Sequence, residues 1–358
     1  MRVSAFGELM VRITPKNYSS FLSLPNEVNF GFGGAEANFL SNLSNFGIKS
    51  FFISALPKNP IGYAALNELN KFGINTKYIR MKDKGRMGLY YCEEGVGSRA
   101  TNITYDRKDS AINKLDFEDY NFKKVFEKTQ HYHISGITPA ISEKAMFVSL
   151  KSVRLAKDMG LKVSCDLNYR SKLWNYKLRG KPVDKEKVMS ELLQYCDYVF
   201  GNEIDLQSFF KIDVSKKEYQ LEKDDLVYYE NLLLQISKRF PHIKIIALSI
   251  RKSENASSNY LGGVLYKRET NQFYFSPNIE GKFKMTKLEP INDRIGSGDA
   301  FSAGFIYGLT KYDNLQNVLD FALYSSVLKH TYKGDFNYAK IEEVEEMVSG
   351  NKYGRIKR

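Results

Sequence analysis

A glycine pair that ends in an aspartate carries the most reactive chemistry in this sequence. The run Asp293-Arg294-Ile295-Gly296-Ser297-Gly298-Asp299 stands directly before an apolar stretch with helical spacing, residues 300–309. Glycines let backbone N–H groups come close to a ligand, and the start of a helix attracts negative charge. The carboxylate of Asp299 would lie beside an anion bound there and could take a proton from an attacking hydroxyl. The pattern suits phosphoryl transfer to an alcohol, although it also suits a capped glycine turn.

A second glycine pair stands far from the first, in Gly33-Gly34-Ala35-Glu36-Ala37-Asn38. It opens an expected helix over residues 35–46, which Gly47 ends. The two glycines would let ligand hydroxyls approach the backbone, and Asn38 offers both a donor and an acceptor. The motif is not a dinucleotide fingerprint, because that fingerprint needs glycine where Glu36 stands, and a Gly-Lys-Ser/Thr phosphate loop is also absent.

The elements that must position these motifs alternate between strand and helix. Buried strands are expected over residues 3–6, 50–56, 132–136, 162–166, 198–201 and 244–249. Helices are expected between several of them, over residues 144–159, 185–195 and 226–239. This alternation predicts an α/β fold with a mostly parallel sheet, helices on both faces, and ligands beyond the carboxyl ends of the strands.

Two aromatic-rich segments interrupt the alternation, at about residues 11–32 and 86–106. Both are typical of extended hairpins, and together they would form a small antiparallel flap that acts as a lid and excludes water. Ordinary surface hairpins are the alternative. The expected organisation is a single domain over residues 1–358 in which these segments are insertions.

Composition excludes several other classes of protein. The formal charge is +12, but the lysines are scattered, so we expect a solvated surface and no nucleic-acid partner. Cys92, Cys165 and Cys196 are far apart, which indicates neither a disulfide framework nor a zinc site. Because no run approaches a membrane span and Glu8 interrupts any signal peptide, we expect a cytoplasmic protein without a membrane partner.

The two glycine motifs together resemble the signatures of the ribokinase-like (PfkB) family of sugar kinases. Matches continue across nearly the whole chain, in residues 133–140 and in Asp166-Leu167-Asn168-Tyr169-Arg170. They are most similar to the branch of the family that acts on 2-keto-3-deoxygluconate. The resemblance implies a three-layer α/β/α sandwich with a β lid that phosphorylates the terminal hydroxyl of 2-keto-3-deoxy-D-gluconate with ATP, giving 2-keto-3-deoxy-6-phosphogluconate and ADP.

For the sugar side, the resemblance implies a role for each matching residue. Asp299 matches the general base, and Gly296, Ser297 and Gly298 match the anion hole. The implied substrate contacts are Gly33, Gly34, Asn38, Tyr90, Tyr105, Arg107, Arg170 and Asp335. The chemistry of guanidinium, which binds carboxylates through two parallel hydrogen bonds, independently favours Arg107 and Arg170 for the acid group of the substrate, with surface arginine as the alternative.

For the nucleotide side, the resemblance implies contacts to ATP from Gly296 and Gly298 together with Asn168, Asn202, Ser249 and Arg251. Mg²⁺ is implied through water, near Glu203 and Asp205, where Asp205 replaces the family's glutamate. A polar helix start capped by Asn202 is the alternative. The polar loop over residues 252–259 departs from the family's compact glycine turn. Dependence on a monovalent cation stays open.

Several alternatives remain at this point. The acceptor could be a neutral sugar such as fructose or ribose, or a nucleoside, and the sugar acid could derive from gluconate or galactonate. A non-catalytic protein that binds sugar or nucleic acid is the remoter alternative. Exposed apolar side chains on lid strands often need a partner, so we expect a homodimer or a higher homo-oligomer through the lid.

Overall fold

The computed structural model describes residues 1–212 and 224–350. A mixed ten-stranded sheet forms its centre, and its path runs β15-β14-β13-β12-β9-β8-β1-β4-β5, with β18 paired to β14. The central strands pair in parallel and β14 is antiparallel to its neighbours. The strands of this sheet are β1 (Arg2–Phe6), β4 (Lys49–Pro57), β5 (Ile79–Lys82), β8 (His131–Ser135), β9 (Lys162–Asp166), β12 (Tyr198–Gly201), β13 (Ile245–Ser253), β14 (Asn259–Lys267), β15 (Gln272–Ser276) and β18 (Thr286–Leu288).

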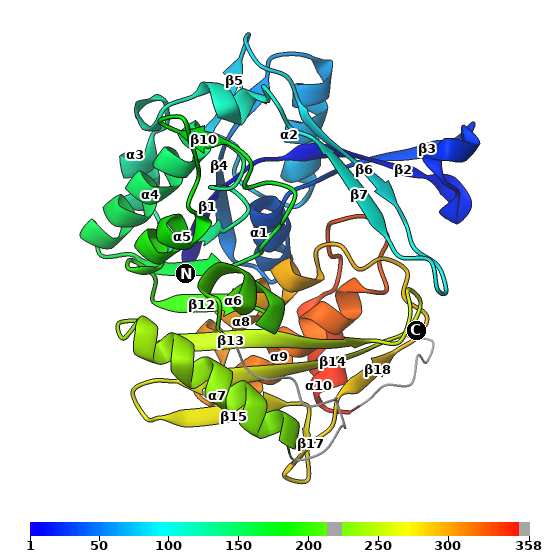
Figure 1. Ribbon diagram of the computed structural model, residues 1–358, viewed down its shortest axis with the longest axis vertical. Helices are drawn as coiled ribbons and strands as arrows, with labels where there is room; N and C mark the ends of the chain where they lie inside the picture. The colour runs from blue at the N-terminus through cyan, green and yellow to red at the C-terminus, as the bar shows by residue number, and fades with distance from the viewer. Residues whose placement is uncertain (213–223, 351–358) are drawn as a thin grey trace.

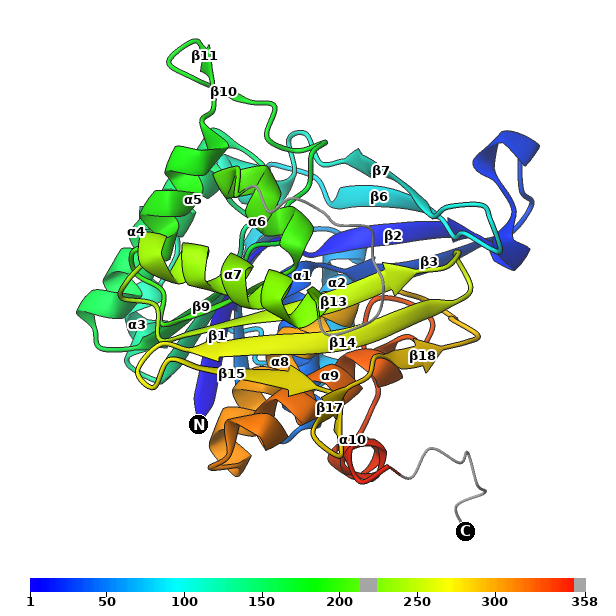
Figure 2. The same cartoon turned by 60° about the horizontal axis from the view of Figure 1, so that its bottom comes forward.

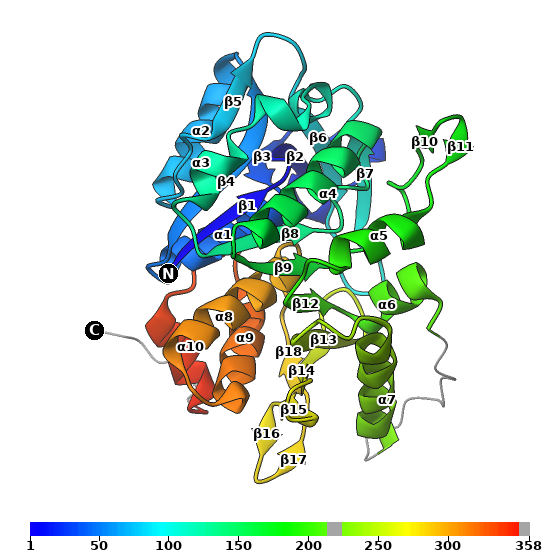
Figure 3. The same cartoon turned by 90° about the vertical axis from the view of Figure 1, so that its left-hand side faces the viewer.

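Helices cover both faces of this sheet (Figure 3). One layer packs around Phe39, Phe305 and Phe321 and consists of α1 (Ala35–Asn45), α2 (Pro60–Lys71), α8 (Ser297–Lys311), α9 (Leu315–Lys329) and α10 (Ile341–Val348). The other packs around Tyr132 and Phe209 and consists of α3 (Phe122–Phe126), α4 (Glu143–Asp158), α5 (Lys185–Leu193), α6 (Glu203–Phe210) and α7 (Asp224–Arg239). The predicted three-layer α/β/α architecture is therefore confirmed, and the expected helices begin and end within a few residues of the observed ones.

The two inserted segments form a separate four-stranded sheet, which we call the lid, in the order β3-β2-β6-β7. Its strands are β2 (Met10–Pro15), β3 (Val28–Gly33), β6 (Gly88–Glu93) and β7 (Asn102–Asp106). The prediction of a purely antiparallel flap is wrong in one respect. Each insertion folds as an antiparallel hairpin, but the two hairpins join through the parallel pair β2 and β6. The lid projects from one edge of the molecule (Figures 1 and 2).

The lid meets the central sheet at its tip. The amide of Ala256 donates to the carbonyl of Gly97 at 2.7 Å, and the amide of Gly97 donates to Ser257 Oγ at 3.0 Å. Ala256 and Ser257 lie in the turn between β13 and β14, within the polar loop expected over residues 252–259. Because β13 runs to Ser253 and β14 begins at Asn259, that loop is a short hairpin turn.

Smaller elements complete the described part of the chain. Two short hairpins pair β10 (Lys177–Leu178) with β11 (Lys181–Pro182) and β16 (Asn278–Ile279) with β17 (Lys282–Phe283). Single turns of 3-10 helix lie at η1 (Lys16–Tyr18), η2 (Phe21–Ser23), η3 (Ala111–Lys114) and η4 (Phe117–Asp119). Among the described helices, none has both the length and the apolar character needed to span a bilayer.

Candidate active site

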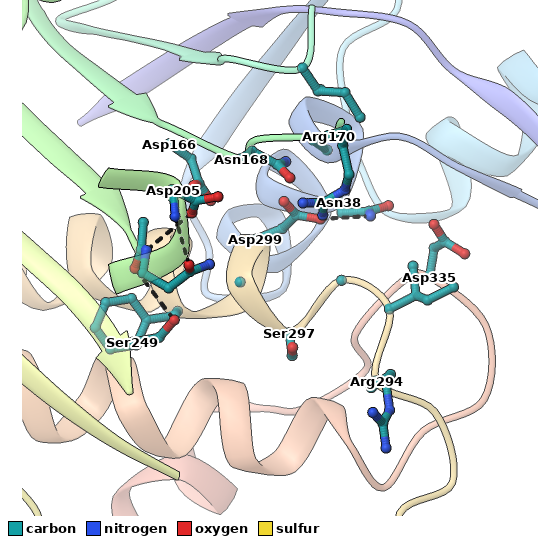
Figure 4. A pocket seen from close by; sticks show the side chains of 18 of the residues that line it. Asn38, Asp166, Asn168, Arg170, Asp205, Ser249, Arg294, Ser297, Asp299 and Asp335 are labelled. Carbon is teal, nitrogen blue, oxygen red and sulfur yellow. Dashed lines mark hydrogen bonds between the residues drawn. The ribbon is translucent and has the colours of Figure 1, made fainter. Parts of the chain in front are cut away.

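A cavity of about 620 Å³ lies between the lid and the carboxyl ends of the parallel strands. This is the expected place for a ligand in a sheet of this topology. The start of α8 forms its floor, and residues after β9 and β12 form its wall (Figure 4). The cavity brings together most of the residues singled out from the sequence, namely Gly34, Asn38, Tyr90, Tyr105, Asn168, Arg170, Asn202, Glu203, Asp205, Ser249, Arg251, Gly296, Ser297, Gly298, Asp299 and Asp335.

Asp299 stands in the first turn of α8 and is almost buried, with 9% of its surface exposed. Its Oδ2 accepts a hydrogen bond of 2.8 Å from Asn38 Nδ2, so the two glycine motifs meet here. Burial raises the pKa of Asp299 to about 7, although the bond from Asn38 opposes the rise. A carboxyl group that a hydrogen bond holds in place and that is half ionised near neutral pH is suited to act as a general base.

Gly296 creates the turn from which α8 begins. Its φ of 83° lies in the left-handed region, which glycine adopts without steric cost. The first backbone hydrogen bond of the helix runs from the Ala300 amide to the Gly296 carbonyl at 2.9 Å. The amides of Gly298 and Asp299 therefore precede the helical hydrogen-bond ladder and sit at the positive end of a 15-residue helix. This end of the cavity suits an anion.

The side of the cavity nearest the lid is also polar. Gly34 directly precedes α1 and Asn38 is the fourth residue of that helix, and the Gly34 amide donates to Asn38 Oδ1 at 3.3 Å. Tyr90 from β6 donates its hydroxyl to Asp335 Oδ1. Gly33 does not line the cavity, because Asp335 packs against it so closely that a Cβ there would meet Asp335 Oδ2 at 2.0 Å. These donors and acceptors suit a ligand with several hydroxyls.

The two arginines expected to meet a carboxylate have different positions. Arg170 lines the cavity, is exposed, and donates through Nη1 to the Tyr169 carbonyl at 2.8 Å. The expectation for Arg107 needs correction: it is buried outside the cavity lining, and its Nε donates to Glu8 Oε2 at 2.6 Å. Glu8 lies 99 residues earlier in the chain, so no local pattern revealed this ion pair.

At the other side of the cavity, Asn202 and Asp205 cap the start of α6. Asn202 Oδ1 accepts from the Asp205 amide at 3.0 Å, and Asp205 Oδ2 accepts from the Asn202 amide at 3.1 Å. The Tyr169 amide donates to the second oxygen of Asp205 at 2.9 Å. The capping alternative is therefore realised, and both residues still line the cavity.

Arg251 lines this side of the cavity as well and donates through Nη2 to Ser297 Oγ at 2.9 Å. Ser249, two residues earlier on β13, also faces the cavity (Figure 4). Within the described residues, no group of three His, Cys, Asp or Glu side chains could hold a metal ion directly. A cation at this side would have to be bound mainly by water and by ligand oxygens.

Two further residues of the site, Asp166 and Arg294, stand in the sequence motifs described above but were not predicted to have a role. Asp166 is the last residue of β9 and lines the cavity, and Ser302 Oγ donates to its Oδ2 at 3.3 Å. Burial, with the nearby charges of Asp205 and Asp299, raises the pKa of Asp166 to about 7. Arg294 also lines the cavity and donates to the Ala256 carbonyl at 2.6 Å. Asp166 could have been predicted from the sequence, because it is an acidic residue at the carboxyl end of a buried strand, where ligands bind in such sheets.

The fold and the site, a buried carboxyl beside a helix start under a lid, are those expected of a small-molecule phosphotransferase. Residues 1–226 match the family described as "pfkB family carbohydrate kinase". The chain belongs to this family, as the resemblance predicted, and is a kinase with an alcohol acceptor.

Similar proteins cover almost the whole chain. A 2-dehydro-3-deoxygalactonokinase of Haloferax volcanii is 26% identical over 98% of this chain and 97% of its own length. The crystal structure of a 2-dehydro-3-deoxygluconokinase from Thermotoga maritima is 32% identical, with a TM-score of 0.87 over 98% of this chain and all of its own. A putative 2-keto-3-deoxygluconate kinase from Enterococcus faecalis is 29% identical, with a TM-score of 0.85 over 100% of this chain and 99% of its own.

Proposed function

We propose that this chain transfers the γ-phosphoryl group of ATP to the terminal hydroxyl of 2-keto-3-deoxy-D-gluconate, giving 2-keto-3-deoxy-6-phosphogluconate and ADP. The observation that carries the substrate class is the position of Arg170. Burial raises the pKa of Asp299, and Arg170 lies close enough for its charge to oppose that rise. Asp299 and Arg170 line the same cavity, and a cavity that offers both a carboxyl and a guanidinium suits a substrate with a hydroxyl at one end and a carboxylate at the other.

In this reaction, Asp299 accepts the proton of the terminal hydroxyl. The hydroxyl oxygen then forms the bond to the γ-phosphorus, and the bond from that phosphorus to the bridging oxygen of ADP breaks. The backbone from Gly296 to Gly298, at the positive end of α8, stabilises the negative charge on the γ-phosphoryl oxygens. Arg251, held against Ser297, adds a positive charge beside the same oxygens.

We assign the substrate hydroxyls to the side of the cavity nearest the lid. Gly34, Asn38, Tyr90, Tyr105 and Asp335 line it and offer donors and acceptors. The substrate carboxylate is assigned to Arg170 alone, because the Nε of Arg107 is already engaged by Glu8.

The nucleotide occupies the side formed by Asn168, Asn202, Ser249 and Arg251. Mg²⁺ belongs to the MgATP substrate in this proposal and neutralises the clustered charge of its phosphates. Asp166, Glu203 and Asp205 would hold the hydrated ion through water. Asp205 is a poor direct ligand, because both of its oxygens already accept backbone amides.

A second acceptor, the galactonate-derived epimer, is favoured by the Haloferax relative, which is named for it. A coupled ADP-release assay should therefore compare 2-keto-3-deoxygluconate, 2-keto-3-deoxygalactonate, fructose and ribose. We expect turnover with one or both acids and little with the neutral sugars. Faster turnover with fructose or ribose would refute the acid as substrate.

Arg170→Ala tests the carboxylate contact directly. Loss of a charged hydrogen-bonded pair should raise KM for the acid by about 10- to 100-fold and leave KM for any neutral sugar nearly unchanged. Arg154→Ala is the matched control, because Arg154 is an exposed arginine on α4 that pairs only loosely with Asp158, at 4.0 Å. An equal effect on acid and neutral acceptors would contradict the assignment.

We further propose that the chain acts as one kinase domain, that it works in the cytoplasm, and that it forms a homodimer through the lid. The dimer is supported by exposed apolar side chains at the lid, Leu22, Leu24, Val28 and Phe30.

A further inference from the structure

Arg12, the third residue of lid strand β2, is buried among three carboxylates. Its Nη1 lies 2.7 Å from Asp293 Oδ2 and 3.1 Å from Asp335 Oδ1, and its Nη2 lies 3.0 Å from Glu94 Oε1. The Nε donates to Thr14 Oγ1 at 2.9 Å. One guanidinium therefore joins the lid to two loops that lie roughly 280 and 320 residues away in the sequence.

Asp293 fixes the loop that leads into α8. Its Oδ1 accepts from the Ile295 amide at 3.0 Å, one residue before Gly296. Its Oδ2, the atom that faces Arg12, also accepts from the Gly334 amide at 3.1 Å. The anion-binding turn and the loop that carries Asp335 are thus tied together at the carboxylate that Arg12 holds.

Asp335 fills the space between the two glycine motifs. A Cβ on Gly33 would meet its Oδ2 at 2.0 Å, and a Cβ on Gly296 would meet its carbonyl oxygen at 2.3 Å. Since both glycines contact Asp335 so closely, a small displacement of the Asp335 loop would move the turn at Gly296. The distance from base to phosphoryl group depends on that turn.

The charges around Arg12 make its position critical. Glu94 also pairs with Lys333 at 2.8 Å, and Lys329 is fully buried near the two aspartates. Buried carboxylates as close as these repel each other unless cations lie among them. Withdrawal of Arg12 would leave Asp293 and Asp335 short of positive charge and loosen both loops.

We propose that Arg12 is a positioning residue that couples the place of lid strand β2 to the geometry of the anion-binding turn. Arg12 does not line the cavity, so it acts through Asp293 and Asp335. The turn at Gly296 is then set for transfer only while the lid strand is docked. This inference rests on the proposed kinase reaction and adds Arg12, which has no role among the sequence-based predictions.

The test compares Arg12→Gln and Arg12→Lys with the wild type on its best acceptor. We expect Arg12→Gln to lower kcat by about 100-fold, because displacement of reacting groups by about 1 Å costs that much. KM for the sugar acid and the dissociation constant for ATP should change far less. Arg12→Lys keeps the charge but cannot reach all three carboxylates, so its kcat should lie between that of the wild type and that of Arg12→Gln.

Hydrogen exchange gives a readout that requires no acceptor. In both variants the amides of Ile295 and Gly334 should exchange faster, while those of the core strand β8 stay protected. Arg86→Lys is the matched control, because Arg86 also ion-pairs near the lid, with Asp106, but contacts neither loop. It should leave kcat and the exchange of both amides unchanged.

The proposal would be overturned by an unchanged kcat, by a loss confined to KM, or by exchange that rises equally throughout the protein. Failure of both Arg12 variants to fold would also overturn it, because Arg12 would then serve stability alone. A wild type without activity on any acceptor would refute the proposed reaction instead, and the exchange experiment would still decide whether Arg12 holds the two loops.

Discussion

At the residue scale, the site depends on a carboxyl group that its surroundings keep from ionising easily. Asp299 is buried, accepts a hydrogen bond from Asn38, and lies near the negative charges of Glu36 and Asp335. Burial raises the pKa of Glu36 and Asp166 to about 7 as well. Several acids near one cavity therefore titrate in the range where a base must change its protonation state.

Asp299→Asn should remove the base and preserve the shape of the site. We expect kcat to fall by about 10²- to 10⁴-fold, since the amide cannot accept the hydroxyl proton. Binding of ATP, measured by calorimetry, should remain within a few-fold of the wild type. Activity that survives this substitution would favour a non-catalytic or differently catalysed function.

The pKa of Asp299 predicts how activity depends on pH. A base with a pKa of about 7 is protonated and inactive below that pH. The value of kcat/KM should therefore fall about tenfold per pH unit on the acid side and level off above pH 7. A profile that stays flat from about pH 5 to about pH 9 would contradict this assignment.

The same shift predicts a cost in stability. Because burial raises the folded-state pKa of Asp299 to about 7, its contribution to stability is present below the unfolded pKa of about 4 and is lost as pH rises through 7. At pH 8, Asp299→Asn should raise the free energy of unfolding by on the order of 1 kcal/mol, and at pH 4 the gain should vanish. Thermal denaturation at both pH values measures this, with Asp158→Asn, at an exposed site, as control. A variant less stable than wild type at pH 8 would refute the argument.

At the element scale, the start of α8 depends on the backbone of one glycine. Gly296 combines a left-handed φ with close contact to the Asp335 carbonyl, and the three residues that follow it line the cavity. The same turn sets the position of Asp299 three residues later. In the proposed reaction, anion binding and proton transfer would therefore both depend on one local conformation.

Gly296→Ala should damage activity more than its strain alone explains. The methyl group would meet the Asp335 carbonyl at 2.3 Å, so the turn must move and kcat should fall by about 100-fold. Gly160→Ala is the control, since Gly160 has a φ of 81° and nothing within 4 Å of a Cβ. It should cost about 1 kcal/mol of stability and no activity. Equal kinetic effects of the two substitutions would count against a special role for this turn.

At the scale of the whole molecule, the lid contacts both the cavity and the turn between β13 and β14. It supplies Tyr90 and Tyr105 to the cavity, and its tip bonds to the β13–β14 turn. On its β3 strand, Val28 and Phe30 are both exposed and share one face because they are two residues apart. An apolar face on so thin a sheet favours a second copy of the chain as its cover.

Phe30→Glu should shift a homodimer toward monomer in light scattering after size exclusion. A charge buried in an apolar interface is costly, so we expect the dimer to weaken by at least about tenfold. Phe147→Glu is the control, because Phe147 on α4 has a similar exposure, 49% against 54% for Phe30. A monomeric wild type would refute the predicted dimer.

The sequence by itself determined the local elements and the family. Strand and helix patterns gave the α/β architecture, and the expected helix over residues 35–46 differs from α1 by one residue. A glycine at a helix start also has a local physical meaning, so each glycine motif indicated a ligand-binding turn. These features depend on neighbours within a few residues and can be read along the chain. That Asn38 and Asp299 share one site was implied only by the resemblance to the family, since the two residues are 261 positions apart.

Tertiary structure alone decided which charges meet. Arg107 pairs with Glu8, Arg12 binds Asp293 and Asp335, and β2 joins β6 in parallel. These contacts link residues from 78 to 323 positions apart, and no sequence periodicity predicts them. Burial and the pKa of Asp299 likewise follow from distant segments that close over it. The chemistry of each residue is local, but its ionisation and its partner depend on how the chain folds around it.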